Sequence, residues 1–301
     1  MNNLRMNSNN RIKKISFRQK KATTCPICSH EFHREEMLTG GGRLIAGNIT
    51  DELRRLYEKN EKYGKVYPLS YLVSVCPNCL YASYPKDFDK ITTDDIESLR
   101  NSSQTRLESI NKYFNNIDFD KNRDLQLGAA SYLLAVECYS DRNKNVAPTF
   151  KIAISSIRAA WLLGDLYEET NNILYKKISD FFYRKAYKSY HLSLKLVQTG
   201  GELMEDVGNL GPDYDKNWGY DGIMYMCAIL TVKIGSKEID LKKRINNFEV
   251  TKRYLSRLFG DGKSSKARPG AIVEMIRELY QTINEMLDKW YQELVEIEET
   301  N

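Results

Sequence analysis

The chain has 301 residues, with 45 Lys or Arg side chains, 40 Asp or Glu side chains and a formal net charge of +5. This length allows one large domain or two, with enough apolar residues to form a core. The longest apolar stretch, residues 223–232, is far shorter than the ~18–20 residues that span a bilayer, and the first residues lack the apolar region of a signal peptide. We therefore expect a cytoplasmic protein without membrane insertion, in which cysteines stay reduced.

Basic residues gather at the start of the chain, where residues 1–21 contain no acid. The basic side chains there are Arg5, Arg11, Lys13, Lys14, Arg18, Lys20 and Lys21. A flexible basic arm can neutralise the phosphates of a nucleic acid. A block of like charge is more often a disordered, solubilising tail, and this is the interpretation we favour for residues 1–21.

Two short motifs of the same form follow, Cys25-Pro-Ile-Cys28 and Cys76-Pro-Asn-Cys79. Each is a tight turn that can place two thiolates on one metal ion, and two such turns complete the tetrahedral four-sulfur shell of a structural Zn²⁺ site. A disulfide or a pair of buried thiols is the alternative, which the expected reducing compartment disfavours. His30 or His33 could replace one thiol in a mixed shell, since such shells are common.

The segment between the two motifs, residues 29–75, is longer than the ~15–20 residues of a compact zinc ribbon. It must therefore leave the metal and return. Residues 51–57 predict a short helix with Thr50 or Asp51 as N-cap, and residues 71–75 predict a strand that enters the second motif. We expect a small α+β zinc-ribbon lobe over residues 22–90, with the motifs at the ends of two hairpins.

Helical periodicity takes over after Pro85. Capping residues at 92–95 predict a helix to about Phe114, Asp124 opens a second, and Pro148 begins a third that ends near Gly164. A long helix is expected over 171–198 and a loop over 208–219. Further helices are expected near 218–235, 246–259 and 267–298, because Gly235, Gly260 and Pro269-Gly270 separate them.

Small residues recur beside aromatic ones in these helices, as in tetratricopeptide hairpins. Gly128-Ala129-Ala130 and Ala159-Ala160-Trp161 are two examples. We therefore predict a mainly α fold, with a tetratricopeptide-like array of helical hairpins over residues 91–301. An irregular helical bundle would bury the same faces.

The 20 Tyr and three Trp residues of the chain include candidates for a binding surface. Tyr214, Trp218 and Tyr220 surround the Gly-rich loop, and we expect them to be exposed and available to a partner. We assign Trp161, Tyr187 and Tyr225 to the core instead, because they stand at helical spacing.

Nothing in the sequence forms a catalytic constellation. Cys138 and Cys227 stand alone in helical patterns and are expected to be buried, and His191 is expected to be a half-buried packing residue. The segment Gly40-Gly41-Gly42-Arg43 lacks the Lys-Ser/Thr of a phosphate-binding loop. We therefore predict no catalytic residues and no enzymatic activity.

The first motif, the segment from Pro68 to Ala82 around the second motif, and Ile157-Arg-Ala-Ala-Trp161 together resemble a bacterial family catalogued as domain of unknown function 2225. The resemblance extends from about Thr24 to Glu285. It implies a zinc-ribbon front joined to a tetratricopeptide-like array, and it implies no activity. Leu80 departs from the family pattern, because such turns usually have Gly there.

These observations together predict a scaffold or adaptor protein. A structural Zn²⁺ would hold the N-terminal lobe, and the helical array would offer a concave surface to a protein or peptide partner. The alternative is a nucleic-acid-binding protein that uses the zinc ribbon and the basic arm.

Overall fold

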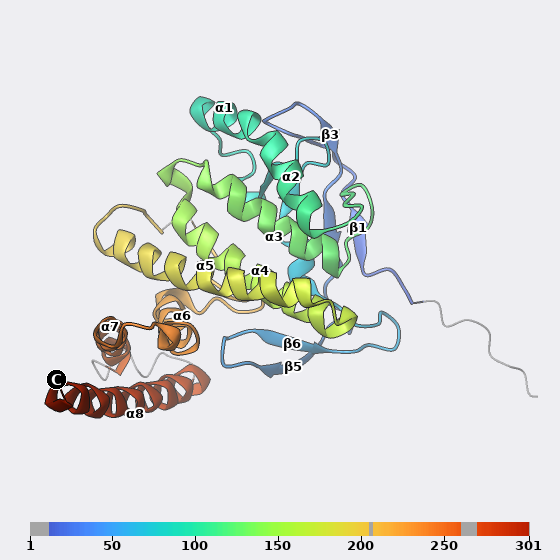
Figure 1. The fold of residues 1–301 in the computed structure, drawn as a ribbon. Coiled ribbons are helices and arrows are strands. Elements are labelled where there is room, and N and C mark those ends of the chain that lie inside the picture. The colour runs from blue at the N-terminus through green and yellow to red at the C-terminus, as the bar shows by residue number, and fades with distance from the viewer. Residues whose placement is uncertain (1–11, 205–206, 260–269, 301) are drawn as a thin grey trace, which may run out of the picture.

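The computed structural model describes residues 12–204, 207–259 and 270–300 (Figure 1). Short strands occupy the N-terminal part: β1 (Ser16–Arg18), β2 (Thr23–Thr24), β3 (Glu31–Phe32), β4 (Glu35–Met37), β5 (Ile45–Ile49), β6 (Arg55–Glu58), β7 (Ser74–Val75) and β8 (Ala82–Ser83). Helices follow: α1 (Thr93–Asn101), α2 (Ser103–Tyr113), α3 (Leu125–Ser140), α4 (Pro148–Thr170), α5 (Ile173–Gln198), α6 (Gly219–Lys233), α7 (Leu241–Phe259) and α8 (Gly270–Thr300).

The strands form small antiparallel pairs: β1 with β4, β2 with β3, β5 with β6 and β7 with β8. In the described residues no strand follows β8. The prediction of a mainly α protein with its strands in the N-terminal part is therefore confirmed. Short 3₁₀ turns, the first over Pro68–Tyr71, connect some of these elements.

The predicted tail, residues 1–21, contains an ordered strand, so this prediction was wrong for its C-terminal part. β1 pairs with β4, and the Ser16 hydroxyl donates to the buried Glu35 carboxylate. Arg18 donates to the backbone carbonyls of Asp120 and Lys121 at 2.8 and 2.7 Å, which ties the strand to the connection before α3. Residues 1–11 lie outside the described residues.

The helix predicted over residues 51–57 was also wrong, since this segment is the turn and second strand of the β5–β6 hairpin. The Thr50 hydroxyl accepts the amides of Glu52 and Arg54 at 3.3 and 3.2 Å. Leu53 then adopts the left-handed conformation, with φ 60°. Thr50 therefore caps a turn in place of a helix, and β6 pairs back onto β5.

Two helix boundaries also differ from the predictions. The segment 92–114 is interrupted at Ser102, which separates α1 from α2. α4 continues past Gly164 to Thr170, because glycine inside a helix is tolerated where a neighbouring helix comes close. The Ser179 hydroxyl of α5 donates to the Ala160 carbonyl of α4 at 2.8 Å, one turn before this glycine.

From α3 to α8, each helix packs against the next one along the chain. One continuous core contains residues from the N-terminal hairpins through to α8, including Cys25, Tyr132, Trp161, Tyr225 and Trp290. The assignment of Trp161 and Tyr225 to the core is confirmed, and Tyr187 is half-buried. The tetratricopeptide-like character of the helical part stays a prediction.

Gly128 of α3 lies where the N-terminal part comes close to this helix. A Cβ atom at this position would lie 2.8 Å from the Cα atom of Ser70, in the first 3₁₀ turn. The Tyr132 hydroxyl, one turn further along α3, donates to the Leu69 carbonyl at 2.8 Å. The absence of a side chain at Gly128 therefore lets the 3₁₀ turn of the N-terminal part pack against α3. The sequence pattern had suggested that another helix packs there.

The tip of the β5–β6 hairpin is buried against three helices through Glu52, which is 5% exposed. Its carboxylate accepts hydrogen bonds from the indole of Trp161 in α4 and from the Tyr183 hydroxyl of α5 at 3.0 Å. Lys233 of α6 completes the set with an ion pair of 2.6 Å. A buried carboxylate with this many donors holds the hairpin tip in one position.

The flanking arginines extend this contact. Arg54 forms a two-pronged ion pair with Asp165 of α4. Arg55 pairs with Asp215 at 3.0 Å, and its backbone amide donates to Asp213 at 2.7 Å, both in the loop before α6. The hairpin thus contacts both α4 and the loop before α6.

Replacing Glu52 by Ala should destabilise the protein strongly, by about 2–4 kcal/mol, since the buried donors of Trp161 and Tyr183 would lose their acceptor. Urea unfolding of the two proteins measures this loss. Glu58→Ala is the matched control, because Glu58 is an exposed carboxylate on the same hairpin. Equal midpoints for E52A and E58A would show that the buried carboxylate does not hold the hairpin.

Candidate metal centre and adjoining pocket

The two Cys-Pro-x-Cys motifs form matching turns at the ends of the β2–β3 and β7–β8 hairpins. In the first, the Ser29 amide donates to the Cys25 carbonyl at 2.9 Å; in the second, the Leu80 amide donates to the Cys76 carbonyl at 3.0 Å. Ser29 and Leu80 both have left-handed backbone conformations, with φ 61° and 58°. Leu80 therefore adopts the glycine-like conformation that its side chain disfavours.

The four cysteine sulfurs gather in one cluster. The Sγ atoms of Cys25 and Cys79 lie 3.6 Å apart, as do those of Cys28 and Cys76, and all four lie within 4.8 Å of one another. Tetrahedral Zn²⁺ with bonds of ~2.3 Å requires sulfur–sulfur distances of about 3.8 Å. The predicted ligands are therefore brought together at distances compatible with a metal site.

Proximity also perturbs the acidity of these thiols. Hydrogen bonds from the neighbouring thiols lower the pKa of Cys25 to about 2. The same interactions raise the pKa of Cys76 to about 12 and raise that of Cys79 as well, because one thiolate disfavours a second beside it. Four thiolates can share this space only when a cation offsets part of their charge, as a divalent metal does.

Two arginines that the sequence analysis did not select hold the turns from the helical side. Arg100 of α1 donates to the Ile27 carbonyl at 3.1 Å, and Arg106 of α2 donates to the Cys79 carbonyl at 2.9 Å. Arg106 is only 1% exposed. Their positive charges lie beside a cluster that would carry a net charge of −2 around Zn²⁺. No spacing in the sequence indicates this role.

The histidines near the first turn are not part of the cluster. The His33 ring shares a 2.8 Å hydrogen bond with the Gln19 carbonyl, and both His30 and His33 are exposed. Among the described residues, the set within ligand distance consists of the four cysteines. The geometry therefore favours an all-sulfur shell.

Replacing Cys76 by Ser should release the metal, because the shell would lose one of its four thiolates. Since metal binding contributes to folding, the N-terminal hairpins should loosen, while the helices from α3 to α8, which pack on one another, stay folded. Zinc content by elemental analysis and helicity by circular dichroism measure the two effects. Cys227→Ser, a change at a buried cysteine of α6, should keep one Zn²⁺ per chain; a full zinc content in C76S would contradict the ligand assignment.

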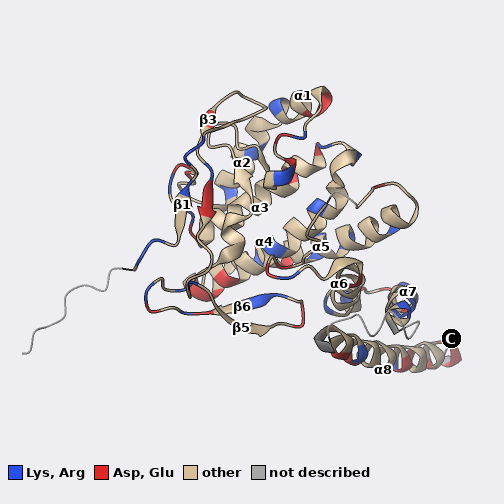
Figure 2. Ribbon diagram, turned by 180° about the vertical axis from the view of Figure 1, so that it is seen from behind, with Lys and Arg blue, Asp and Glu red and all other residues tan. Residues whose placement is uncertain are grey.

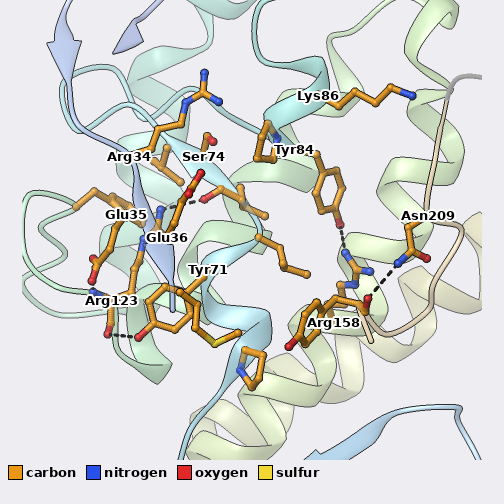
Figure 3. Close-up of a pocket in the computed structure, with 18 of the residues that line it drawn as sticks. Arg34, Glu35, Glu36, Tyr71, Ser74, Tyr84, Lys86, Arg123, Arg158 and Asn209 are labelled. Atoms are coloured by element: carbon orange, nitrogen blue, oxygen red, sulfur yellow. Dashed lines mark hydrogen bonds between the residues drawn. The ribbon is translucent and has the colours of Figure 1, made fainter. Parts of the chain in front are cut away.

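A cavity of about 520 Å³ lies between the N-terminal strands and α4. β4 and the β7 region supply one wall, with Glu35, Val73 and Val75, and α4 supplies the other, with Phe150 and Arg158. Figure 3 shows Tyr71, Glu35 and Arg123 on one side of this pocket and Tyr84, Arg158 and Asn209 on the other. Its walls therefore depend on the packing of the N-terminal part against the helices.

The three aromatic residues predicted for partner binding have different environments. Tyr214 is half-buried and lines the pocket, and Tyr220 is half-buried on α6. Trp218 is only 7% exposed, so its predicted exposure was wrong. The loop folds back on itself through a hydrogen bond from the Trp218 amide to the Gly211 carbonyl. Lys216 covers the indole of Trp218, with its Nζ atom 4.0 Å from the ring centroid.

The isolated residues Cys138 and Cys227 are buried, as predicted. His191 is half-buried on α5, also as predicted, where its Nε2 atom lies 2.9 Å from the Thr231 hydroxyl of α6. Burial lowers the pKa of His191 to about 4, because the charged ring would lose its hydration.

This shift makes stability depend on pH. Since the folded-state pKa lies below the unfolded value of about 6.5, the unfolded chain binds the additional proton, and stability falls as pH falls from 6.5 toward 4. The free energy of unfolding should decrease by about 1–2 kcal/mol between pH 7 and pH 5 through this residue. The substitution His191→Gln should remove this contribution to the pH dependence of stability. Urea unfolding between pH 7 and pH 5 measures it, with His30→Gln as the exposed control. Parallel curves for wild type and H191Q would contradict the assignment.

Helices in the described part of the chain are too short or too polar to cross a membrane. Comparison with solved structures gave no match. An uncharacterized protein of Borreliella burgdorferi (strain ATCC 35210 / DSM 4680 / CIP 102532 / B31) is 40% identical over 274 residues, which cover 91% of this chain and 98% of the relative. The model of the family described as "Uncharacterized protein conserved in bacteria (DUF2225)" matches residues 19–283, and the chain belongs to this family.

Proposed function

We propose that this chain is a non-catalytic scaffold or adaptor protein that carries a structural Zn²⁺ and binds a protein partner through its helical part. The four thiols support the first part of the proposal, because a closed sulfur shell leaves no coordination position for a substrate. The surface for a partner is the outer face of α5. It differs from the residues expected from the sequence, Tyr214, Trp218 and Tyr220, of which Trp218 is buried.

The exposed face of α5 is the observation that carries the proposal. Ile173, Phe181 and Leu192 are 57%, 53% and 50% exposed and recur at helical spacing. Lys177, Arg184 and Lys188 lie between them on the same face and are exposed as well. Exposed apolar side chains with charged neighbours are typical of a protein-binding surface, because a bound partner removes the apolar side chains from water.

Charge indicates the kind of partner. α5 contains six basic residues and one acid, Asp180, which pairs with Lys176 at 2.5 Å. α8 has the opposite balance, with eight acidic and two basic residues. The acidic positions are the red segments along α8 in Figure 2. A partner that covers the α5 face should therefore carry acidic side chains beside apolar ones, as α8 does.

Photo-crosslinking from position 181 tests this proposal. A photoreactive phenylalanine analogue in place of Phe181 should crosslink to an acidic segment of a partner protein in the native cell. The same analogue in place of Leu107, an exposed residue of α2, is the control and should not. The double change Lys177→Glu and Lys188→Glu should reduce the crosslink by about tenfold, because it places like charges face to face. Equal crosslinking with the reversed charges would contradict an acidic partner.

Nucleic-acid binding is the second candidate, and the exposed residues Lys13, Lys14, Lys20 and Lys21 around β1 favour it. Replacing these four by Gln should then reduce the salt dependence of DNA or RNA binding, because fewer counterions would be released. Crosslinking of residue 181 to nucleic acid in place of protein would also support this candidate.

A further inference from the structure

The pocket between the N-terminal strands and α4 has an excess of positive charge. Its charged lining consists of six basic residues and two acids: Arg18, Arg34, Lys86, Arg123, Lys151 and Arg158, against Glu35 and Glu36. Glu35 is satisfied within the wall, since it accepts from the Ser16 hydroxyl and, at 2.8 Å, from the Arg123 amide. On the same side, Arg18 pairs with Glu35 and Arg34 pairs with Asp89, each at 3.8 Å. Most of the excess therefore lies on the other side, where α4 forms the wall.

Two buried cations flank one tyrosine in that wall. Lys151 and Arg158 are both 4% exposed, and their charged groups lie 5.1 and 5.5 Å from the centroid of the Tyr84 ring. Lys151 pairs with Asp87 at 3.0 Å. Burial nevertheless lowers the pKa of Lys151, because the loss of hydration outweighs the attraction of Asp87.

Arg158 is bonded to neutral acceptors. Its Nε atom donates to the Pro212 carbonyl at 2.8 Å, and a terminal nitrogen donates to the Tyr84 hydroxyl at 3.1 Å (Figure 3). Asp213 attracts it from a longer distance, while the oxygens of Asp213 accept the backbone amides of Tyr214 and Arg55. Among the described residues, Arg158 forms no ion pair. A buried guanidinium in this situation is stabilised by an added anion.

The remaining lining is largely apolar, with Phe32, Leu72, Val73, Phe150, Ile154 and Val207. The pocket volume of about 520 Å³ suits a small organic molecule, because binding sites for such molecules have volumes of about 300–1,000 Å³. Apolar walls with a few buried polar groups are the usual composition of such sites.

We propose that this pocket binds a small organic anion, whose carboxylate or phosphate group lies at Arg158 and whose apolar body lies against Leu72 and Phe150. The guanidinium provides planar N–H donors suited to either acid group. The site uses neither the exposed face of α5 nor the metal, and it is independent of the partner proposed above.

A matched ligand series tests the head group. Octyl phosphate, octanoate and octanol share an eight-carbon body, and titration calorimetry on the full zinc-loaded chain measures their binding. Octyl phosphate or octanoate should bind with one molecule per chain, and octanol should bind about tenfold more weakly or worse, since a hydrogen bond to a charged group is lost. Inorganic phosphate, which lacks the body, should also bind more weakly. Equal affinity for octanol would overturn the proposal.

Two variants test the location. Arg158→Gln should weaken binding of the anion by about tenfold while leaving the weak binding of octanol unchanged. Since this change in a buried residue could affect folding, Leu72→Glu is a second variant at a half-buried position, where the new carboxylate should repel the anion. Leu203→Glu, at a leucine that is 66% exposed and outside the pocket, is its control.

Unchanged affinity in folded R158Q, or in L72E, would overturn the proposed location. If acetate displaced octyl phosphate at equal concentration, the alkyl chain would contribute nothing to binding. This result would overturn the proposed contact of the apolar body with Leu72 and Phe150. An acidic peptide that binds more tightly than octyl phosphate, and whose binding is lost in L72E, would assign the pocket to a protein segment. That result would overturn the proposal that the ligand is a small molecule.

Discussion

The carboxylate of Glu52 is the constraint on which the arrangement of this molecule depends. It lies at the tip of a hairpin that belongs to the N-terminal part, and its donors come from three helices, through Trp161, Tyr183 and Lys233. A buried carboxylate is tolerated only where its hydrogen bonds are made, so the hairpin and the helices have one relative position that satisfies all of them. The length of the segment between the two cysteine motifs follows from this contact, because the chain has to reach the helices and return.

The cysteine cluster and the approach at Gly128 complete the attachment. The cluster joins two hairpins, Arg100 and Arg106 hold these hairpins from α1 and α2, and Gly128 admits the 3₁₀ turn over Pro68–Tyr71 against α3. A pocket remains where the N-terminal strands meet α4. Its two walls come from different parts of the chain, so the site exists only when both parts are folded and packed together.

Local signals in the sequence predicted much of this structure. The repeated Cys-Pro-x-Cys motif predicted the cluster, and the cap Asp124 and the first-turn proline Pro148 predicted helix starts correctly. The failures involve contacts between distant segments. Thr50 and Asp51 gave a helix signal that the pairing of β6 with β5 overrides, and Trp218 is covered because its loop folds back on Gly211. The roles of Glu52, Arg106 and Arg158 depend on partners that no spacing reveals, so the pocket could not be predicted.

The long reach of Glu52 has a consequence for the order in which the protein forms on the ribosome. Its partners lie 109, 131 and 181 residues further along the chain. The four cysteines have all been synthesised once residue 79 emerges, so their cluster can form before the helices. The carboxylate at the hairpin tip, in contrast, lacks its full set of donors until α6 has been translated. During that interval Leu53, which is 1% exposed in the finished protein, would lie in water beside Glu52. The nascent N-terminal part would therefore expose Leu53 and its charged neighbours until its own helices cover them.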